Sequence, residues 1–186
     1  RGGRVDVPGT LAVLPRKTLD LMLAEGADEA GARFHAPARF MGAIETDGVV
    51  VGATLQSGDE TREIRARWVV LATGAVPQAI LATGMCERQS PSGVALRGYV
   101  RNPALVDRIK AIEIVWHRAL RPGYGWIFPC GDGVFNIGVG VSHSHDGKDS
   151  QTGRHVKADI NLRHILQDFQ RVYEPARALM DGGEVV

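Results

Sequence analysis

The residues of this chain that could take part in chemistry gather between Pro122 and Gly140, in the segment PGYGWIFPCGDGVFNIGVG. Three aromatic residues alternate there: Tyr124, Trp126 and Phe128. Because successive side chains of a strand point to opposite faces, the three rings share one face. Aromatic rings can bury an apolar ligand and exclude water. The segment therefore predicts a strand with one aromatic face, and it names no acid or base.

A tight turn should fold this segment back on itself. Pro129 cannot donate to a sheet, and residues 130–133, Cys-Gly-Asp-Gly, have the composition of a turn. We therefore expect a hairpin whose second strand runs from Val134 to Val141.

Two registers of this hairpin are open. A four-residue loop pairs Trp126 with Ile137, and a slip by one residue places the rings beside Gly138 and Gly140. In either register, we expect the glycines to leave a backbone surface bare for close approach by a ligand or another chain. The structural alternative is an ordinary core hairpin in which the glycines only relieve twist.

The order of these residues resembles the signature of the geranylgeranyl reductase family of flavoproteins. That signature runs Tyr or Phe, x, Trp, x, Phe-Pro, then seven or eight residues, then Gly-x-Gly. Its six fixed positions fall here on Tyr124, Trp126, Phe128, Pro129, Gly138 and Gly140. The resemblance implies that these six residues bind substrate. It further implies that the hairpin lines a tunnel for a long isoprenoid chain below a flavin ring, in a fold similar to p-hydroxybenzoate hydroxylase.

Composition and charge favour a globular protein without a nucleic-acid partner. The chain has 186 residues, 44% of them hydrophobic and 23% charged, and a formal net charge of +1. This charge offers no basic footprint for nucleic acid. No apolar run approaches the length of a membrane span, and RGGRVDVPG at the N-terminus lacks a signal-peptide core. Cys86 and Cys130 have no metal-ligand spacing, so we expect no metal site and a cytoplasmic location.

The first part of the chain predicts a helix followed by a β-meander. Apolar residues recur at helical spacing between Pro15 and Gly31. Short β-rich runs then cover residues 39–46, 49–56 and 61–65, separated by Asp-Gly and Ser-Gly-Asp turns. An apolar run at 67–71 ends in Ala72-Thr73-Gly74, which predicts a strand buried on both faces and a tight turn at Gly74.

This order of elements resembles the part of two-dinucleotide-binding-domain flavoproteins that follows their first cofactor motif. The resemblance implies that Arg16, Thr73 and Gly74 lie near FAD. The family more often has Ala-Asp-Gly followed by Ser, whereas this chain has Thr73 and then Val-Pro-Gln at 76–78. For Arg16 the alternative is a solvated side chain in a first helical turn.

The chain contains no Gly-x-Gly-x-x-Gly fingerprint and no Gly-Asp-Ala segment of the family's type. Pyrophosphate binding needs the helix N-terminus that such a fingerprint creates. We therefore expect flanking segments of the same protein to complete the flavin site.

The second part predicts a sheet, a loop and a helix. Strand patterns cover 93–101 and 111–117 in addition to the hairpin, residues 142–154 are polar and rich in turn formers, and a broad apolar stripe from 159 predicts a helix that Pro175 kinks or divides. The fold class is α+β, with a mixed, mainly antiparallel sheet. We assign 1–84 to a partial FAD-binding domain and 85–186 to a substrate-binding domain.

Three further candidates have stronger structural explanations. His143 and His145 with Asp146 could chelate a metal, but alternate residues in a loop lack ordered support. His117 could donate a proton, although a satisfied strand histidine is the more common case. Cys130 could touch substrate, although it more simply fits its turn.

The sequence thus predicts part of an FAD-dependent oxidoreductase that reduces carbon–carbon double bonds of an isoprenoid or other long apolar substrate. A peripheral membrane contact would be compatible with such a substrate. One alternative is a flavin monooxygenase or halogenase of the same fold, which a polar residue inside the expected tunnel would favour. The other is a cofactor-free lipid-binding or interaction module.

Overall fold

The computed structural model describes residues 3–85, 93–142 and 160–186, which fall into two compact units. The larger unit comprises Arg1–Asp20 and Ser92–Val186, and the smaller comprises Leu21–Pro91. The boundary at Asp20 falls within helix α1 (Arg16–Glu29), which begins one residue after Pro15, as the sequence predicts. The loop predicted at 142–154, apart from Ser142, and the start of the helix predicted at 159 lie outside the described residues.

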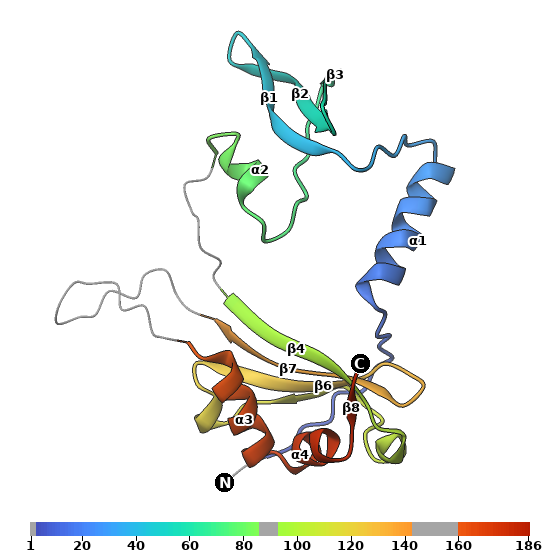
Figure 1. The fold of residues 1–186 in the computed structure, drawn as a ribbon, viewed down its shortest axis with the longest axis vertical. Coiled ribbons are helices and arrows are strands. Elements are labelled where there is room, and N and C mark those ends of the chain that lie inside the picture. The colour runs from blue at the N-terminus through green and yellow to red at the C-terminus, as the bar shows by residue number, and fades with distance from the viewer. Residues whose placement is uncertain (1–2, 86–92, 143–159) are drawn as a thin grey trace, which may run out of the picture. The chain divides into compact units, whose positions relative to one another are not determined.

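The described residues of the larger unit form a five-stranded antiparallel sheet in the order β5-β6-β7-β4-β8 (Figure 1). Its strands are β4 (Gly93–Arg101), β5 (Glu113–Val115), β6 (Gly123–Pro129), β7 (Val134–Ser142) and β8 (Glu184–Val185). Short 3-10 helices, η1 (Pro103–Leu105) and η2 (Arg118–Leu120), lie on either side of β5 in sequence. The strand predicted over 111–117 is thus formed only at its centre.

Two helices cover one face of this sheet: α3 (Leu162–Val172) and α4 (Glu174–Asp181) (Figure 1). The predicted division at Pro175 is confirmed, because Tyr173 has extended backbone angles and Pro175 stands in the first turn of α4. The fully buried side chains between helices and sheet form the core: Val100, Leu120, Ile127, Phe135, Ile137, Val139, Phe169, Ala176 and Leu179.

The described part of the smaller unit contains the expected meander, with antiparallel order β1-β2-β3. The strands are β1 (Arg39–Thr46), β2 (Val49–Ser57) and β3 (Glu60–Arg65), and a short helix α2 (Gln78–Leu81) follows. Asp47 and Gly48 both have positive φ, 53° and 75°, as a two-residue hairpin turn requires. The structure thus has helices and mainly antiparallel sheets, and the α+β prediction is confirmed.

The prediction of a strand at 67–71 is wrong. No strand is formed there, and Trp68 and Val70 are each 84% exposed. None of the strands that the structure describes pairs with this segment, and without a partner an extended run gains no ladder hydrogen bonds. The turn expected at Gly74 is present, with φ of 66°.

Candidate functional site

The hairpin β6–β7 adopts the register in which the aromatic rings stand opposite glycines. Trp126 pairs with Gly138 and Tyr124 with Gly140. The cause is the turn: Cys130 N–H donates to the Val134 carbonyl at 2.8 Å, which leaves a loop of only three residues. All three, at 131–133, have positive φ, so the Gly-Asp-Gly composition allows the shorter loop.

The bare backbone surface expected at these glycines is not open, because rings of the chain itself fill it. The Trp126 indole lies so close over Gly138 that a Cβ there would collide with the ring and with the Leu96 carbonyl oxygen. On the opposite face, a Cβ at Gly125 would lie 2.6–2.7 Å from the ring of Phe169. The glycines serve close packing inside the chain, and this corrects the expectation.

The rings form a continuous row on the face of the sheet that α3 and α4 leave uncovered. The centroids lie 5.8 Å apart from Tyr124 to Trp126 and 6.0 Å apart from Trp126 to Phe128. Trp116 extends the row, with its centroid 6.1 Å from that of Tyr124. Trp126 is 8% exposed, whereas Trp116 is 73% exposed. The row therefore presents apolar surface, while the Trp126 ring within it is buried.

Trp116 lies outside the six signature positions, and the sequence analysis missed it. The signal was available in the strand predicted over 111–117, where Ile114 and Trp116 alternate. In the structure, Ile114 pairs with Trp126. Ile114 and Trp116, which is two residues further along the chain, therefore lie on the same face of the sheet as the rings.

Three polar side chains share this face. Asn136, which is 7% exposed, accepts a hydrogen bond from Trp126 Nε1 at 2.8 Å. Arg97 and Tyr99 of β4 lie across from Gly138 and Asn136. Arg97 Nη1 donates to the Tyr99 hydroxyl at 3.0 Å, and its guanidinium carbon lies 5.6 Å from the Tyr99 ring centroid. The face is thus apolar along the ring row and cationic at Arg97.

The side chains of Cys130 and His117 each make a local hydrogen bond that has a structural role. The Cys130 thiol lies 3.4 Å from the Phe128 carbonyl oxygen, to which it donates, and burial raises the pKa of this thiol. A protonated thiol is a poor nucleophile. His117 Nδ1 accepts from Ala119 N–H at 3.1 Å and so caps η2. His143, His145 and Asp146 lie outside the described residues.

The residues expected near FAD are exposed. Arg16 begins α1 and donates from Nε to Asp20 Oδ1 at 2.9 Å, one helical turn away. Thr73 and Gly74 lie at a turn of the smaller unit, and no heavy atom of the described residues lies within 4 Å of a Cβ built on Gly74. The backbone at Gly74 is therefore open to a ligand.

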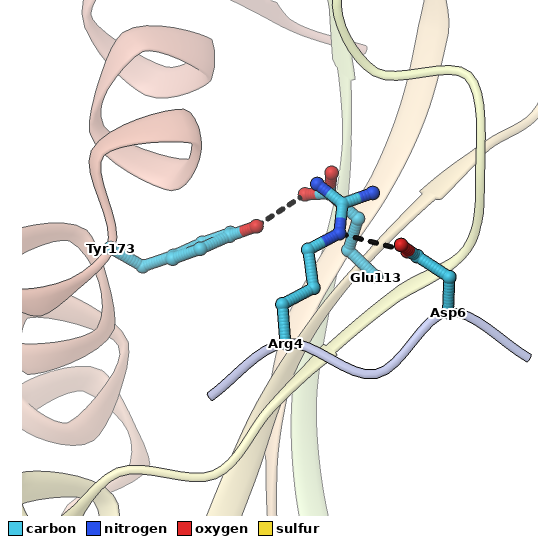
Figure 2. Close-up of polar contacts among 4 residues, drawn as sticks. All are labelled: Arg4, Asp6, Glu113 and Tyr173. Atoms are coloured by element: carbon cyan, nitrogen blue, oxygen red, sulfur yellow. Dashed lines mark hydrogen bonds and ion pairs between the residues drawn. The ribbon is translucent and has the colours of Figure 1, made fainter. Parts of the chain in front are cut away.

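A second polar cluster, formed by Arg4, Asp6, Glu113 and Tyr173, ties the helices to the edge strand β5 (Figure 2). The Tyr173 hydroxyl donates to Glu113 Oε2 at 2.8 Å, and Arg4 Nε donates to Asp6 Oδ1 at 2.8 Å. Burial, and then the bond to the Glu113 carboxylate, raises the pKa of Tyr173 to about 12. The hydrogen bond to Asp6 raises the pKa of Arg4 further above its usual range. The bond between Tyr173 and Glu113 is a structural tie, whereas the Arg4–Asp6 pair is local and exposed.

Among the described residues, no group of three His, Cys, Asp or Glu side chains is placed to hold a metal ion. No helix in the described segments is both long and apolar enough to cross a membrane.

The chain is similar in sequence to named reductases. Digeranylgeranylglycerophospholipid reductase 2 of Methanopyrus kandleri is 29% identical over 174 residues, which cover 93% of this chain and 42% of that protein. The corresponding enzyme of Methanosarcina acetivorans is 33% identical over 73% of this chain and 34% of its own length. A menaquinone reductase of Mycobacterium tuberculosis is 33% identical over 90% of this chain and 41% of its own length. No family model matches the chain.

Solved structures agree with these relatives. A geranylgeranyl bacteriochlorophyll reductase-like protein of Thermoplasma acidophilum superposes with a TM-score of 0.70 at 22% identity, over 92% of this chain and 40% of that one. In sequence and in fold, the chain is thus similar to proteins named for the geranylgeranyl reductase family. A flavin-dependent brominase shares the fold, with a TM-score of 0.66 at 16% identity over 92% of this chain and 41% of that one.

The family resemblance predicted from the hairpin is therefore confirmed. The chain spans about two fifths of the length of the reductases that it matches. The structure brings together, on the hairpin β6–β7, the six residues that match the signature of that family. Their role in binding substrate stays a prediction.

Proposed function

We propose that this chain is the part of a flavin-dependent reductase that binds a long apolar substrate, whose carbon–carbon double bonds the enzyme reduces. The observation that carries the proposal is the row of rings from Trp116 to Phe128 on the face of the sheet that the helices leave uncovered. A chain-like hydrocarbon can lie along such a row and bury its surface against successive rings.

The names of the relatives support one class of substrate. Several are named reductases of digeranylgeranylglycerophospholipid and others of menaquinone, and both names denote molecules with isoprenoid chains. A ring row without acid or base suits such substrates, since the cofactor would supply the hydride chemistry and the protein the water-excluding surface. An isoprenoid is therefore the substrate that we propose.

The residues of this chain fit an FAD site in part. An open backbone at Gly74 allows a nucleotide to come close, and Arg16 offers an exposed cation at the start of a helix. We propose that Arg16, Thr73 and Gly74 contact FAD. Because the 186 residues contain no glycine fingerprint, we expect the pyrophosphate to be held by flanking segments of the same protein.

We further propose that residues 1–84 belong to the flavin-binding domain and residues 85–186 to the substrate domain. We expect the protein in the cytoplasm, with a peripheral membrane contact where an isoprenoid lipid is delivered.

A test is turnover of a geranylgeranyl lipid by the intact protein with reduced FAD, measured as the mass gained for each double bond reduced. Trp126→Ala should lower kcat/KM about tenfold or more while flavin absorbance is retained, because loss of this ring leaves a gap in the row along which the substrate would lie. Trp126→Phe, which keeps an aromatic ring, is the matched control and should lose less. If Trp126→Ala turns over the lipid as fast as the wild type does, the assignment of the ring row to substrate binding is contradicted.

A flavin monooxygenase or halogenase is a second candidate. The polar pair of Arg97 and Tyr99 beside the rings and the likeness to a flavin-dependent brominase favour it. Oxygen-dependent hydroxylation or halogenation of an aromatic substrate by the wild-type protein, without reduction of an isoprenoid, would decide for this candidate.

A further inference from the structure

Asn136 is a buried polar residue on an otherwise apolar strand. It is 7% exposed, and its neighbours Phe135 and Ile137 are core residues. Buried polar side chains are rarely kept without hydrogen-bond partners, since an unmade bond costs free energy. The Oδ1 of Asn136 accepts from Trp126 Nε1 at 2.8 Å, so this bond accounts for the oxygen.

The position of this bond decides how the indole lies. Trp126 stands opposite Gly138, and its ring lies across Gly138 and reaches to 3.4 Å from a Cβ built on Gly140. Asn136 holds the nitrogen edge of the indole, and Phe128 stacks beside it at an interplanar angle of 27°. The missing glycine side chains give the ring room, and Asn136 fixes its orientation.

We propose that Asn136 is a positioning residue for substrate binding: it holds the Trp126 indole down on the glycines, so that the ring stays flat within the row along which the substrate would lie. Without this acceptor, the indole N–H would be buried without a partner, and the ring would turn toward water to satisfy it. A turned ring would stand in the path of a substrate lying along the row. The inference deepens the proposed function and rests on it.

The first measurement reads the ring itself in the intact protein labelled with 15N-tryptophan. The resonance of the Trp126 indole N–H is assigned by its disappearance in Trp126→Phe. Asn136→Leu, which keeps the branched shape and removes the acceptor, should shift this resonance and speed its hydrogen exchange. Asn136→Asp, which keeps an acceptor oxygen in place, should preserve slow exchange. If Asn136→Leu leaves the resonance and its exchange unchanged, the inference is overturned.

The second measurement links the ring to substrate by a double-mutant cycle on kcat/KM for a geranylgeranyl lipid. In the wild-type background, Asn136→Leu should lower kcat/KM about fivefold, in keeping with the loss of one hydrogen bond. In a Trp126→Phe background, which has no donor, the same change should have no further effect. An equal loss in both backgrounds would show that Asn136 acts otherwise, and would overturn the inference.

Two outcomes are separated in advance. If Asn136→Leu does not fold, Asn136→Ala removes the acceptor without adding bulk and takes its place in both measurements. If the wild-type protein reduces no isoprenoid, the proposed function and the role in substrate binding both fail, and the indole resonance still decides whether Asn136 positions Trp126.

Discussion

The indole of Trp126 lies directly over the backbone of Gly138 in the neighbouring strand. This contact explains why the signature joins a tryptophan to a distant glycine: any side chain at 138 would occupy the volume of the ring. It also fixes the register, since a slip by one residue would set Ile137 opposite Trp126 and exchange the two faces of β7.

Gly138→Ala should therefore destabilise the protein, although alanine usually suits a strand better than glycine. Its Cβ would meet the Leu96 carbonyl oxygen, a backbone atom that cannot turn aside. We expect the free energy of unfolding to fall by about 1–3 kcal/mol, as for other overpacked sites. Urea unfolding of the intact protein measures it.

Gly140→Ala is the matched control, two residues along the same face. The nearest atom to its Cβ would be Trp126 Cζ3 at 3.4 Å, an ordinary contact. This variant should be as stable as wild type or more stable by about 0.5–1 kcal/mol. Equal effects of the two substitutions would contradict the close contact of Trp126 with Gly138.

A second glycine packs against the helix layer. Gly125→Ala would press a methyl group into the Phe169 ring, which is fully buried and stacks on Tyr173 at 5.7 Å. We expect a loss of about 1–3 kcal/mol in unfolding free energy. Gly98→Ala, on the same face of the sheet, meets no atom within 4 Å in the part of the chain that the structure describes and should be close to neutral. Thermal unfolding of both variants tests the difference.

Elements with local signals were predictable from the sequence. The meander follows from Asp47-Gly48 and the turn after it, because these residues reach positive φ at little cost. The division of the C-terminal helix follows from Pro175, which lacks the N–H of a helix interior. The aromatic face follows from alternation in β6.

Features that local residue types leave open, or that depend on partners distant in sequence, were not predictable. The hairpin register depends on whether the loop holds three or four residues, and glycine-rich turns permit both. The apolar run at 67–71 predicts a strand, yet a strand also needs a neighbour to pair with. The bond between Glu113 and Tyr173 joins residues of types that are common on surfaces, so neither signals the other.

Cys130 should be a slow thiol. Because burial raises its pKa, little thiolate is present near neutral pH, and the thiolate is the nucleophile. We expect alkylation of Cys130 by iodoacetamide at pH 8 to be at least about tenfold slower than that of glutathione, followed by mass spectrometry of its peptide. Alkylation as fast as that of glutathione would show the thiol to be activated.

Tyr173 should make stability depend on pH in the alkaline range. Its pKa is about 12 in the folded protein, whereas an unfolded chain has a tyrosine pKa of about 10. Between these values the folded protein keeps a proton that the unfolded chain has released, so raising the pH favours unfolding. The stabilisation is complete below about pH 10 and is lost as the pH rises toward about 12.

Tyr173→Phe removes this dependence together with the hydrogen bond to Glu113. At pH 8 the variant should be less stable than wild type by about 1 kcal/mol, the usual value of one partly exposed hydrogen bond. The difference in stability should shrink as the pH rises through this window, because deprotonation of Tyr173 removes from the wild type a stabilisation that the variant lacks at every pH. Urea unfolding of both proteins from pH 8 to 11 measures the difference, and tyrosinate absorbance follows the titration.

Glu113→Gln, which keeps an acceptor without the charge, should lower the pKa of Tyr173 and move the loss of stability to lower pH. Wild-type and Tyr173→Phe curves that stay parallel up to pH 11 would show that the Glu113 bond does not hold the Tyr173 proton.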